Sequence, residues 1–400
     1  MERKNWTKFP VLFSLYIAQS VPMSFFSTVV PVIMRQENYS LESIGLLQLV
    51  KVPWIIKFFW APLVDSKASK PLHYKRWIIL SELFYAIIII GIGFLNLQTD
   101  FRLIIILMVT AFIASATQDI ATDAYAILIL KKEERGIGNS MQSGGSFAGA
   151  LLGTGVLLIA YHYFGWSLLL YLLACFVLFA IIPLLFYDSG KNNVPFDNQK
   201  ERISLADIYH FFAEKGKHKR VLILSFYYSG IIGILAMIKP YMVDLGYTVK
   251  EIGVISGIIG TSVAAAAAFL SGLIIKKAGR RFSSFLYASI SLAAALFFVI
   301  ISRGNPSGWQ IYTGICLVWG AYGLSTVVIY TTSMDIVRKG REGTDFTIQI
   351  VISHLSGMII AILSGKVGDL LGYTGLFSLE AALAAINILI LFYALPKKMY

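Results

Sequence analysis

Long apolar segments recur along the whole chain, and they constrain its fold more than any other feature. Twelve segments of about 20 residues or more are each able to cross the hydrocarbon core of a bilayer as a helix. Only 14% of the residues are charged, against about 25% in a soluble domain. We therefore predict an all-α protein of twelve transmembrane helices in a lipid bilayer. They cover residues 9–34, 42–64, 77–97, 102–130, 137–162, 166–187, 219–243, 250–275, 282–302, 308–336, 344–368 and 373–395.

One long polar connection divides these segments into six and six. We predict an N-terminal six-helix bundle over 1–187, a cytoplasmic linker over 188–218 and a C-terminal six-helix bundle over 219–400. The linker contains apolar residues at roughly helical spacing among charges, which is typical of an amphipathic helix on a membrane surface. They are Ile203, Leu205, Ile208, Phe211 and Phe212.

The basic residues predict the orientation. Placing the N-terminus inside puts twenty-six of the 34 Lys and Arg residues in cytoplasmic segments, so both termini are predicted to be cytoplasmic. The net charge of +12 comes from these short loop clusters and forms no nucleic-acid-binding face. We expect no nucleic-acid partner.

The two halves of the sequence repeat each other. Residues 39–45 match 247–253 at an offset of 208, and 134–136 match 341–343 at an offset of 207. Gln142 and Gln349 follow the second match at that same spacing. Both six-helix units start inside, so the repeats are parallel, as in the halves of major facilitator transporters. Alternating access needs this symmetry, whereas channels and membrane enzymes rarely do.

Two acids interrupt the fourth apolar segment. Asp119 and Asp123 lie one helical turn apart on one face, and a carboxylate in hydrocarbon indicates a functional site. Lys51 and Lys57 lie in the second segment; counting residues puts Lys57 at the depth of Asp123 and Lys51 at that of Asp119. We predict Asp119 as the proton carrier, because desolvation favours its neutral form, and Asp123 with Lys57 as a fixed pair. Two alternatives are one coupled network of all four groups and a purely structural ion pair.

Candidate gating residues lie at the cytoplasmic ends of the helices. Asp65 ends the second segment before a basic loop, and we predict that it caps the start of helix eleven near 343–345. The counterpart loop of the C-terminal half keeps an Arg pair but has Gly272 instead of an acid. The other predicted gating residues are Arg76, Arg135, Arg280, Arg281 and Asp335.

Polar and aromatic residues inside the apolar segments are candidates for lining a substrate cavity. His354 could also carry a proton, although a lone intramembrane histidine is more often a hydrogen-bonded packing residue. Gly145, Gly149 and Gly153 form a small-residue stripe that we expect to pack on helix eight around 264–268. The predicted cavity residues are Gln19, Trp54, Gln118, Tyr125, Gln142, Tyr227, Tyr330 and His354.

The sequence contains no phosphate loop, dinucleotide fingerprint, metalloprotease helix motif or nucleophile elbow. Its two cysteines, Cys175 and Cys316, both lie in apolar segments. We predict no enzyme activity, no catalytic residues, no cofactor and no metal.

Several of these segments resemble a known family. Residues 57–65 (KFFWAPLVD) and 118–124 (QDIATDA), extended by 134–139 (ERGIGN) and Gln142, are similar to the muropeptide permeases (AmpG-like) of the major facilitator superfamily. They are also similar to the siderophore-permease relatives of that family. The resemblance covers the whole chain. It implies a bacterial inner-membrane permease that takes up a siderophore or a cell-wall sugar-peptide.

We therefore predict a monomeric secondary transporter that imports a bulky polar small molecule with protons by a rocker-switch mechanism. The residues alone indicate only a secondary transporter. Two other classes remain open: a polytopic membrane enzyme of the acyl transferase type, and a membrane sensor that binds its ligand without moving it.

Overall fold

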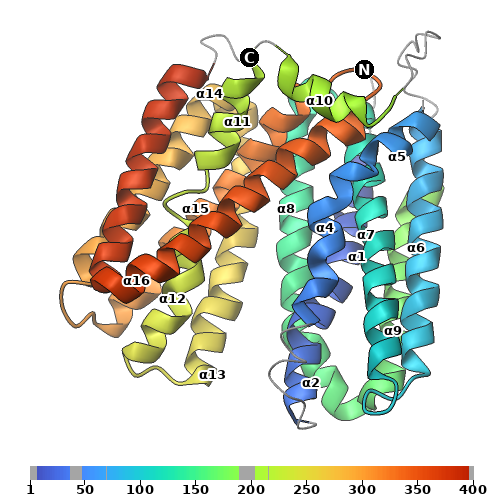
Figure 1. Ribbon diagram of the computed structural model, residues 1–400, viewed down its shortest axis with the longest axis horizontal. Helices are drawn as coiled ribbons and strands as arrows, with labels where there is room; N and C mark the ends of the chain where they lie inside the picture. Colours follow the sequence, from blue (N-terminus) through green and yellow to red (C-terminus); the bar gives the residue numbers. More distant parts are fainter. Residues whose placement is uncertain (1–6, 37–46, 69, 189–202, 215, 396–400) are drawn as a thin grey trace. The chain divides into compact units, whose positions relative to one another are not determined.

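The computed structural model describes residues 7–36, 47–68, 70–188, 203–214 and 216–395, and every element in these ranges is a helix or a helical turn. The repeat segment 39–45 and the linker residues 189–202 and 215 therefore lie outside the described residues. The α-helices are α1 (Lys8–Ser24), α2 (Val30–Gln36), α4 (Val52–Ile56), α5 (Ala61–Lys67), α6 (Pro71–Gly93), α7 (Phe101–Ile129), α8 (Arg135–Leu151), α9 (Leu157–Phe186), α10 (Ala206–Ala213), α11 (Lys217–Phe226), α12 (Ile232–Asp244), α13 (Val249–Ile252), α14 (Thr261–Ile301), α15 (Gly308–Met334) and α16 (Glu342–Ala394) (Figure 1).

Short π and 3-10 segments interrupt or extend several of these helices. The π segments are η1 (Phe25–Val29), η5 (Leu152–Val156) and η7 (Gly253–Gly260), and the 3-10 turns are η2 (Leu47–Lys51), η3 (Lys57–Phe59) and η4 (Lys132–Glu134). Such segments often mark hinges or functional sites, because they change the depth and direction of the residues that follow.

Seven helices in the described ranges are long and apolar enough to cross a membrane, so the chain is a multi-pass membrane protein. Three very long helices contain a break at a glycine with positive φ: Gly165 in α9, Gly279 in α14 and Gly372 in α16. Glycine is favoured there because a side chain would meet the backbone in this conformation. The number twelve remains a prediction.

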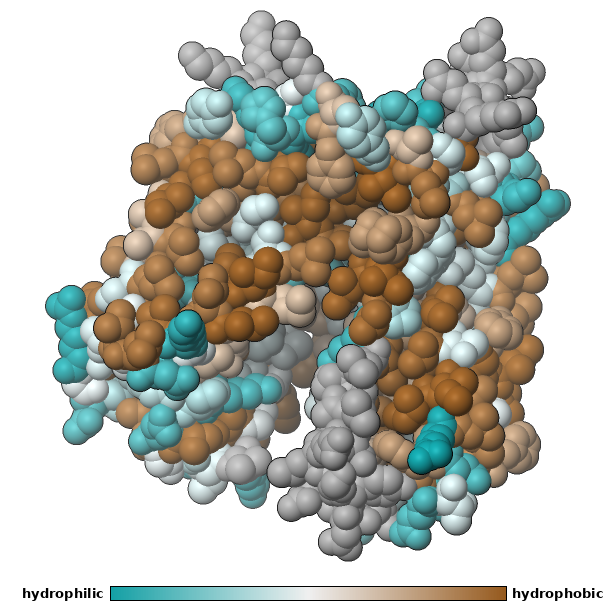
Figure 2. All heavy atoms as spheres, viewed as in Figure 1, coloured by the Kyte–Doolittle hydropathy of each residue, from teal (hydrophilic) through white to brown (hydrophobic). Residues whose placement is uncertain are grey.

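The chain forms two compact units. Unit 1 contains residues 1–131, 145–208 and 337–347, and unit 2 contains 132–144, 209–336 and 348–400. The start of α8 thus belongs with the later helices, and the start of α16 belongs with the earlier ones. On the face seen in Figure 2, hydrophobic side chains cover the sides of the helices within each unit, and hydrophilic ones gather near the helix ends.

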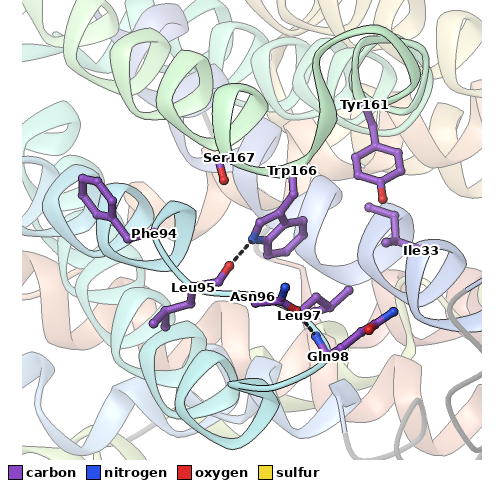
Figure 3. Close-up of a pocket in the computed structure, with 9 residues that line it drawn as sticks. All are labelled: Ile33, Phe94, Leu95, Asn96, Leu97, Gln98, Tyr161, Trp166 and Ser167. Atoms are coloured by element: carbon purple, nitrogen blue, oxygen red, sulfur yellow. Dashed lines mark hydrogen bonds between the residues drawn. The ribbon is translucent and has the colours of Figure 1, made fainter.

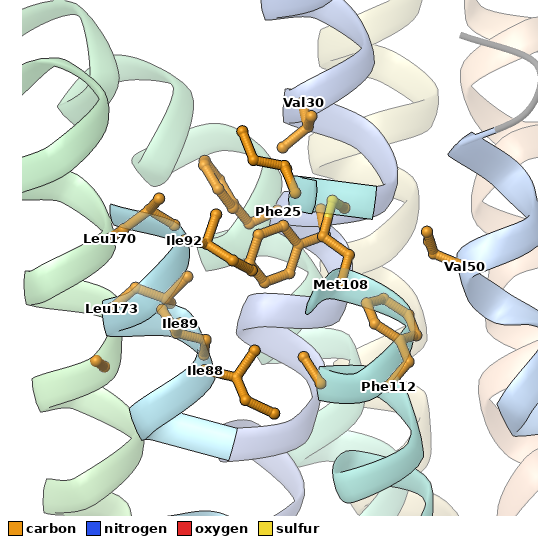
Figure 4. Packing of buried hydrophobic residues seen from close by; sticks show 14 of the residues in the cluster. Phe25, Val30, Val50, Ile88, Ile89, Ile92, Met108, Phe112, Leu170 and Leu173 are labelled. Atoms are coloured by element: carbon orange, nitrogen blue, oxygen red, sulfur yellow. The ribbon is translucent and has the colours of Figure 1, made fainter. Parts of the chain in front are cut away.

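Unit 1 is built around three neighbouring helices, α6, α7 and α9 (Figure 1). Their facing side chains form a buried cluster with residues of α1, η1 and α2 (Figure 4). Inside a bilayer such a cluster stabilises the fold through close packing, because lipid tails are as apolar as the side chains. The cluster includes Phe25, Ile88, Ile89, Ile92, Met108, Phe112, Leu170 and Leu173.

Unit 2 has a similar buried cluster between α12, α14, α15 and the second part of α16. One helix start in this unit has a clear sequence signal: Ser307 and Gln310 form a capping box at the beginning of α15. The predicted linker helix is present as α10, in which Phe211 is buried while Leu205, just before the helix, and Phe212 are exposed.

Candidate functional site

A buried ion pair lies inside unit 1. The ammonium group of Lys57 contacts the Asp119 carboxylate, and both side chains are almost inaccessible. The 3-10 turn η3 carries Lys57 between two short helices, each of which has a proline near its start, whereas Asp119 belongs to the continuous helix α7. The Lys57 Nζ also lies 4.6 Å from the centre of the Trp54 ring. This arrangement neutralises two charges in a place where either one alone would be strongly destabilised.

The predicted pairing of Lys57 with Asp123 is wrong. Asp123 instead accepts a 2.6 Å hydrogen bond from the Tyr16 hydroxyl of α1. The residue count assumed one continuous α-helix, whereas the second segment is divided into η2, α4, η3 and α5. The three residues of η3 add only about 1.5 Å between Lys57 and the end of the segment, which is less than one helical turn. The breaks in the segment and the length of the lysine side chain together let the Nζ atom reach Asp119, one turn deeper than predicted. Lys51 is half-buried and has no ion-pair partner among the described residues.

Gln19 and Gln118 extend this polar cluster. The Gln19 side-chain amide donates a hydrogen bond to the Gln118 side-chain oxygen, and both residues are buried. Gln19 lies three residues before Pro22, which is inside α1. The cluster thus joins α1, the broken second segment and α7, and it can hold one positive and two negative charges away from water.

The remaining cavity candidates do not form one group within either unit. In unit 1, Tyr125 is buried in α7. In unit 2, Gln142 is buried and the Tyr227 hydroxyl donates to the Ser284 carbonyl at 2.9 Å. Tyr330 is partly buried and His354 is exposed. Their predicted role as a cavity lining remains a prediction.

Asp65 contacts the start of α16, as predicted. Its carboxylate accepts hydrogen bonds from the Gly343 amide at 3.1 Å, the Thr344 amide at 2.7 Å and the Thr344 hydroxyl at 2.6 Å. The Tyr74 hydroxyl donates a fourth bond at 2.7 Å. All of these residues belong to unit 1. The first amides of a helix have no partner within the helix, and here a buried carboxylate satisfies two of them.

Three predicted gating residues come together in unit 2. Asp335 accepts from Arg135 at 2.9 Å and from Arg280 at 2.7 Å, and Arg280 also donates to the Lys132 carbonyl. The two other candidates lie elsewhere. Arg76 is exposed, and Arg281 donates to the Leu395 carbonyl at the end of the last helix.

A second network sits beside α10. Arg341 contacts the Asp207 carboxylate, and Arg338 donates to the Asp207 carbonyl and to the Asp345 carboxylate. These residues all belong to unit 1. The sequence did not predict these ion pairs: Asp207 lies in the linker helix α10, Arg338 in the connection before α16, and Asp345 in the first turn of α16, each among other charges.

Two buried acids were also missed. Glu82 lies inside α6, and Glu380 lies inside the last part of α16, each at 1% exposure or less. Glu380 accepts hydrogen bonds from the Gly230 amide at 2.9 Å and the Ser364 hydroxyl at 2.6 Å. A single acid within an apolar span is the same signal that drew attention to Asp119, and it was available for both residues.

The predicted partner of the glycine stripe is wrong. Gly145, Gly149 and Gly153 pack on α1: a Cβ atom added to Gly149 would lie 2.5 Å from the Ser20 Cβ, and one on Gly153 would lie 2.4 Å from the Val21 carbonyl oxygen. The glycines of α8 that face α14 are Gly144, one position before Gly145, and Gly136, nine positions before it. A stripe that continues along a helix gives no sign of where one neighbour ends and the next begins.

Unit 1 also has a pocket of about 470 Å³ where α6 ends and α7 begins (Figure 3). Trp166 and Tyr161 of α9 and the connection between α6 and α7 line it, and the Trp166 ring nitrogen donates to the Leu95 carbonyl at 3.1 Å. None of the predicted site residues lines this pocket.

A bundle of apolar helices with buried charges in its interior is the architecture of a membrane transporter. The sequence profile of the Major Facilitator Superfamily matches residues 12–359, and the chain belongs to this family. The anhydromuropeptide permease of Escherichia coli K12 is 23% identical over 95% of this chain and 78% of its own length. The resemblance to muropeptide permeases is therefore confirmed.

Solved structures share the fold. A bacterial homologue of the iron transporter ferroportin in the outward-facing state superposes with a TM-score of 0.72 at 14% identity, covering 97% of this chain and 98% of its own. The transporter FucP in the outward conformation gives 0.73 at 15% identity, covering 98% and 99%. Membership of the Major Facilitator Superfamily and the permease relatives, rather than these structures, point to a secondary transporter and not to an enzyme.

Proposed function

We propose that this protein imports a bulky polar sugar-peptide across a bacterial inner membrane together with protons. The solute class is taken from the anhydromuropeptide permease to which the chain is similar over 95% of its length. A siderophore is the second candidate, on the strength of the QDIATDA and ERGIGN segments. Both termini lie in the cytoplasm in this proposal, and the monomer works through twelve helices by alternating access.

The buried Lys57–Asp119 pair supports proton coupling. A carboxylate that pairs with an ammonium group in one conformation stays ionised there. When the two groups separate, the lone carboxylate is desolvated and takes up a proton. Alternation between these two forms would bind one proton on one side of the membrane and release it on the other.

Uptake by purified protein in proteoliposomes tests the proposal. Radiolabelled anhydromuropeptide should accumulate when an inward proton gradient is imposed, and a protonophore should abolish the accumulation. Accumulation of a labelled ferric siderophore instead would identify the second candidate. Accumulation that does not respond to the gradient would refute proton coupling.

The same assay separates the two other classes. A membrane enzyme would convert the labelled solute without accumulating it, and a sensor would bind it without flux. The Asp119→Asn variant should retain exchange of solute down its own gradient while it loses accumulation. If that variant still accumulates solute under a pH gradient, Asp119 is not the proton carrier.

A further inference from the structure

Glu82 is a buried acid that the proposed mechanism does not use. It is the twelfth of the 23 residues of α6, about 16 Å from the start of the helix at 1.5 Å per residue, and its residue exposure is 1%. Neither carboxylate oxygen has a hydrogen-bond partner among the described residues. An ionised carboxylate without a donor is very unfavourable in hydrocarbon, and binding a proton removes most of that cost.

The packing of α6 on α7 fixes what lies beside Glu82. Ile92 of α6 and Met108 of α7 lie at one level of the unit 1 cluster. Ile88 and Phe112 lie at the next level, one turn nearer the start of α6 and one turn nearer the end of α7 (Figure 4). Tyr85 and Ser115 form the next contact. Because the helices are antiparallel, the following turn brings Glu82 to the level of Gln118 and Asp119.

Depth gives the same answer independently. Asp119 lies ten residues from the end of α7 at Ile129, which is about 15 Å and matches the depth of Glu82 within 2 Å. The Gln118 side-chain nitrogen is buried at this level and has no hydrogen-bond partner within the described part of the chain. It is a donor available to a Glu82 carboxylate.

The elements packed against Glu82 supply no cation at its depth. On α7 the charged residues are Arg102, Asp119 and Asp123, and Arg102 lies at the far end of that helix. Helix α9 has no Asp, Glu, Lys or Arg. Its one histidine, His162, lies in the second turn of α9. On α6 itself, His73, Tyr74, Lys75 and Arg76 lie in the first two turns, and Tyr85 lies one turn from Glu82. Lys57 is the one nearby cation described, and Asp119 binds it.

We propose that Glu82 is a second proton-binding group of unit 1 and exchanges its proton with Asp119. While Asp119 is paired with Lys57, Glu82 holds the proton. When Lys57 separates, the O–H bond of Glu82 breaks, an O–H bond forms on Asp119, and the negative charge remains on Glu82. The Gln118 amide stabilises that charge until Glu82 is protonated again from solvent. This exchange rests on the proposed proton coupling, but the proton on Glu82 does not.

Infrared spectroscopy of the purified full-length protein in nanodiscs tests the proton itself. At neutral pH the wild type should show the C=O stretch of a protonated carboxyl, and Glu82→Gln should lose this band. Glu251→Gln, at an exposed acid hydrogen-bonded to Thr248, is the matched control and should keep it. An unchanged band in Glu82→Gln would overturn the proposal.

Transport measurements test the exchange. In proteoliposomes that contain a pH-sensitive dye, Glu82→Gln should lower gradient-driven accumulation of anhydromuropeptide about tenfold or more, with exchange close to wild type. Glu82→Asp should restore part of the accumulation, because it restores a titratable group. Wild-type coupling in Glu82→Gln would overturn the exchange role. If the wild type itself shows no coupling, the proposed function and the exchange fail, while the infrared band still decides whether Glu82 holds a proton.

Discussion

The carboxylate of Asp65 lies against the backbone of Gly343, although 278 positions separate them in the sequence. Within the internal repeat, Asp65 corresponds to Gly272 and Gly343 corresponds to Gly136, both at an offset of 207. The second pair is also in contact, because a Cβ atom on Gly136 would lie 3.3 Å from the Gly272 carbonyl oxygen. The repeat therefore places the same two positions together twice.

The two contacts differ in chemistry for a steric reason. A Cβ atom on Gly272 would lie 2.1 Å from the Ser140 hydroxyl oxygen and 2.6 Å from the Gly136 carbonyl oxygen. No acidic side chain fits there without moving α8 away from α14. At Asp65 the helix start is far enough away for the carboxylate to fill the space and bond the free amides.

Asp65→Asn should weaken this contact. The amide keeps the size of the side chain but loses the negative charge that the helix start attracts, a loss of about 0.3–1 kcal/mol and up to about 2 kcal/mol in a buried site. We expect cysteine-labelling probes on the predicted cytoplasmic side to react faster in this variant, after Cys175 and Cys316 have been replaced. Thr344→Val, which removes the hydroxyl donor but keeps both amides, should have a smaller effect. Equal labelling of Asp65→Asn and the parent protein would contradict the role.

The same contact predicts a dependence on pH. Asp65 lies just beyond the predicted second span, and burial raises its pKa to about 6, although hydrogen bonds from Thr344 and Tyr74 oppose the rise. Because the pKa is higher in the folded state than in the unfolded chain, proton binding to Asp65 stabilises the fold. This contribution is complete at a pH below the ordinary pKa of aspartate and is lost as the pH rises through about 6. Opening of the contact has the same sign, because an exposed Asp65 regains its ordinary pKa and the closed contact binds the extra proton.

Labelling on the cytoplasmic side should therefore decrease as the pH falls from about 7.5 to about 5, because the closed contact binds the proton more tightly than the opened one. Asp65→Asn should remove this dependence and react at a constant, faster rate. A pH profile that persists unchanged in the variant would assign the titration to another group.

The glycines that contact α1 give a stability prediction with an internal control. Gly153→Ala places a methyl group 2.4 Å from the Val21 carbonyl oxygen, whereas Gly155→Ala in the same π segment meets nothing within 4 Å. Overpacking of this kind costs about 1–3 kcal/mol. Gly153→Ala should lower the midpoint of thermal unfolding in detergent, and Gly155→Ala should leave it unchanged. Equal midpoints would show that α1 moves aside without cost.

What the sequence predicts well is what depends on spacing alone. The apolar segments, the helix α10 in the linker and the contact of Asp65 with the start of α16 all follow from patterns in the sequence. The pairing of Lys57 was missed because the second segment is divided into short helices and 3-10 turns, whose breaks have no sequence signal as strong as that of a continuous helix. The neighbour of Gly149 was missed because a small-residue stripe marks a close approach without identifying the partner.

Gly230, at the break between α11 and α12, gives a second stability prediction with a matched control. Gly230 and Gly216 both have a φ of +91°, so alanine at either position costs about 1–2 kcal/mol in backbone strain. At Gly230 the new methyl group would also lie 2.5 Å from the Ala384 Cβ, while at Gly216 it would meet nothing within 4 Å. Gly230→Ala should therefore destabilise the protein more than Gly216→Ala in thermal unfolding. Equal effects would mean that the packing of Gly230 against the last helix contributes nothing.

The ion pair of Lys57 and Asp119 predicts a non-additive double-mutant cycle. Lys57→Gln or Asp119→Asn alone leaves one buried charge without its partner, which typically costs about 3–5 kcal/mol. The double variant removes both charges, so it should be more stable than either single variant in thermal unfolding. The pair of Lys217 with the half-exposed Glu214, at 3.4 Å, is the control, and its removal should cost about 1 kcal/mol or less.

Transport should not follow stability in this cycle. The double variant recovers the fold but has no group that alternates between a proton and an ammonium partner, so it should exchange solute without gradient-driven accumulation. Additive losses of stability would show that the two charges do not stabilise each other. Accumulation in the double variant at the wild-type level would show that the pair only holds the helices together.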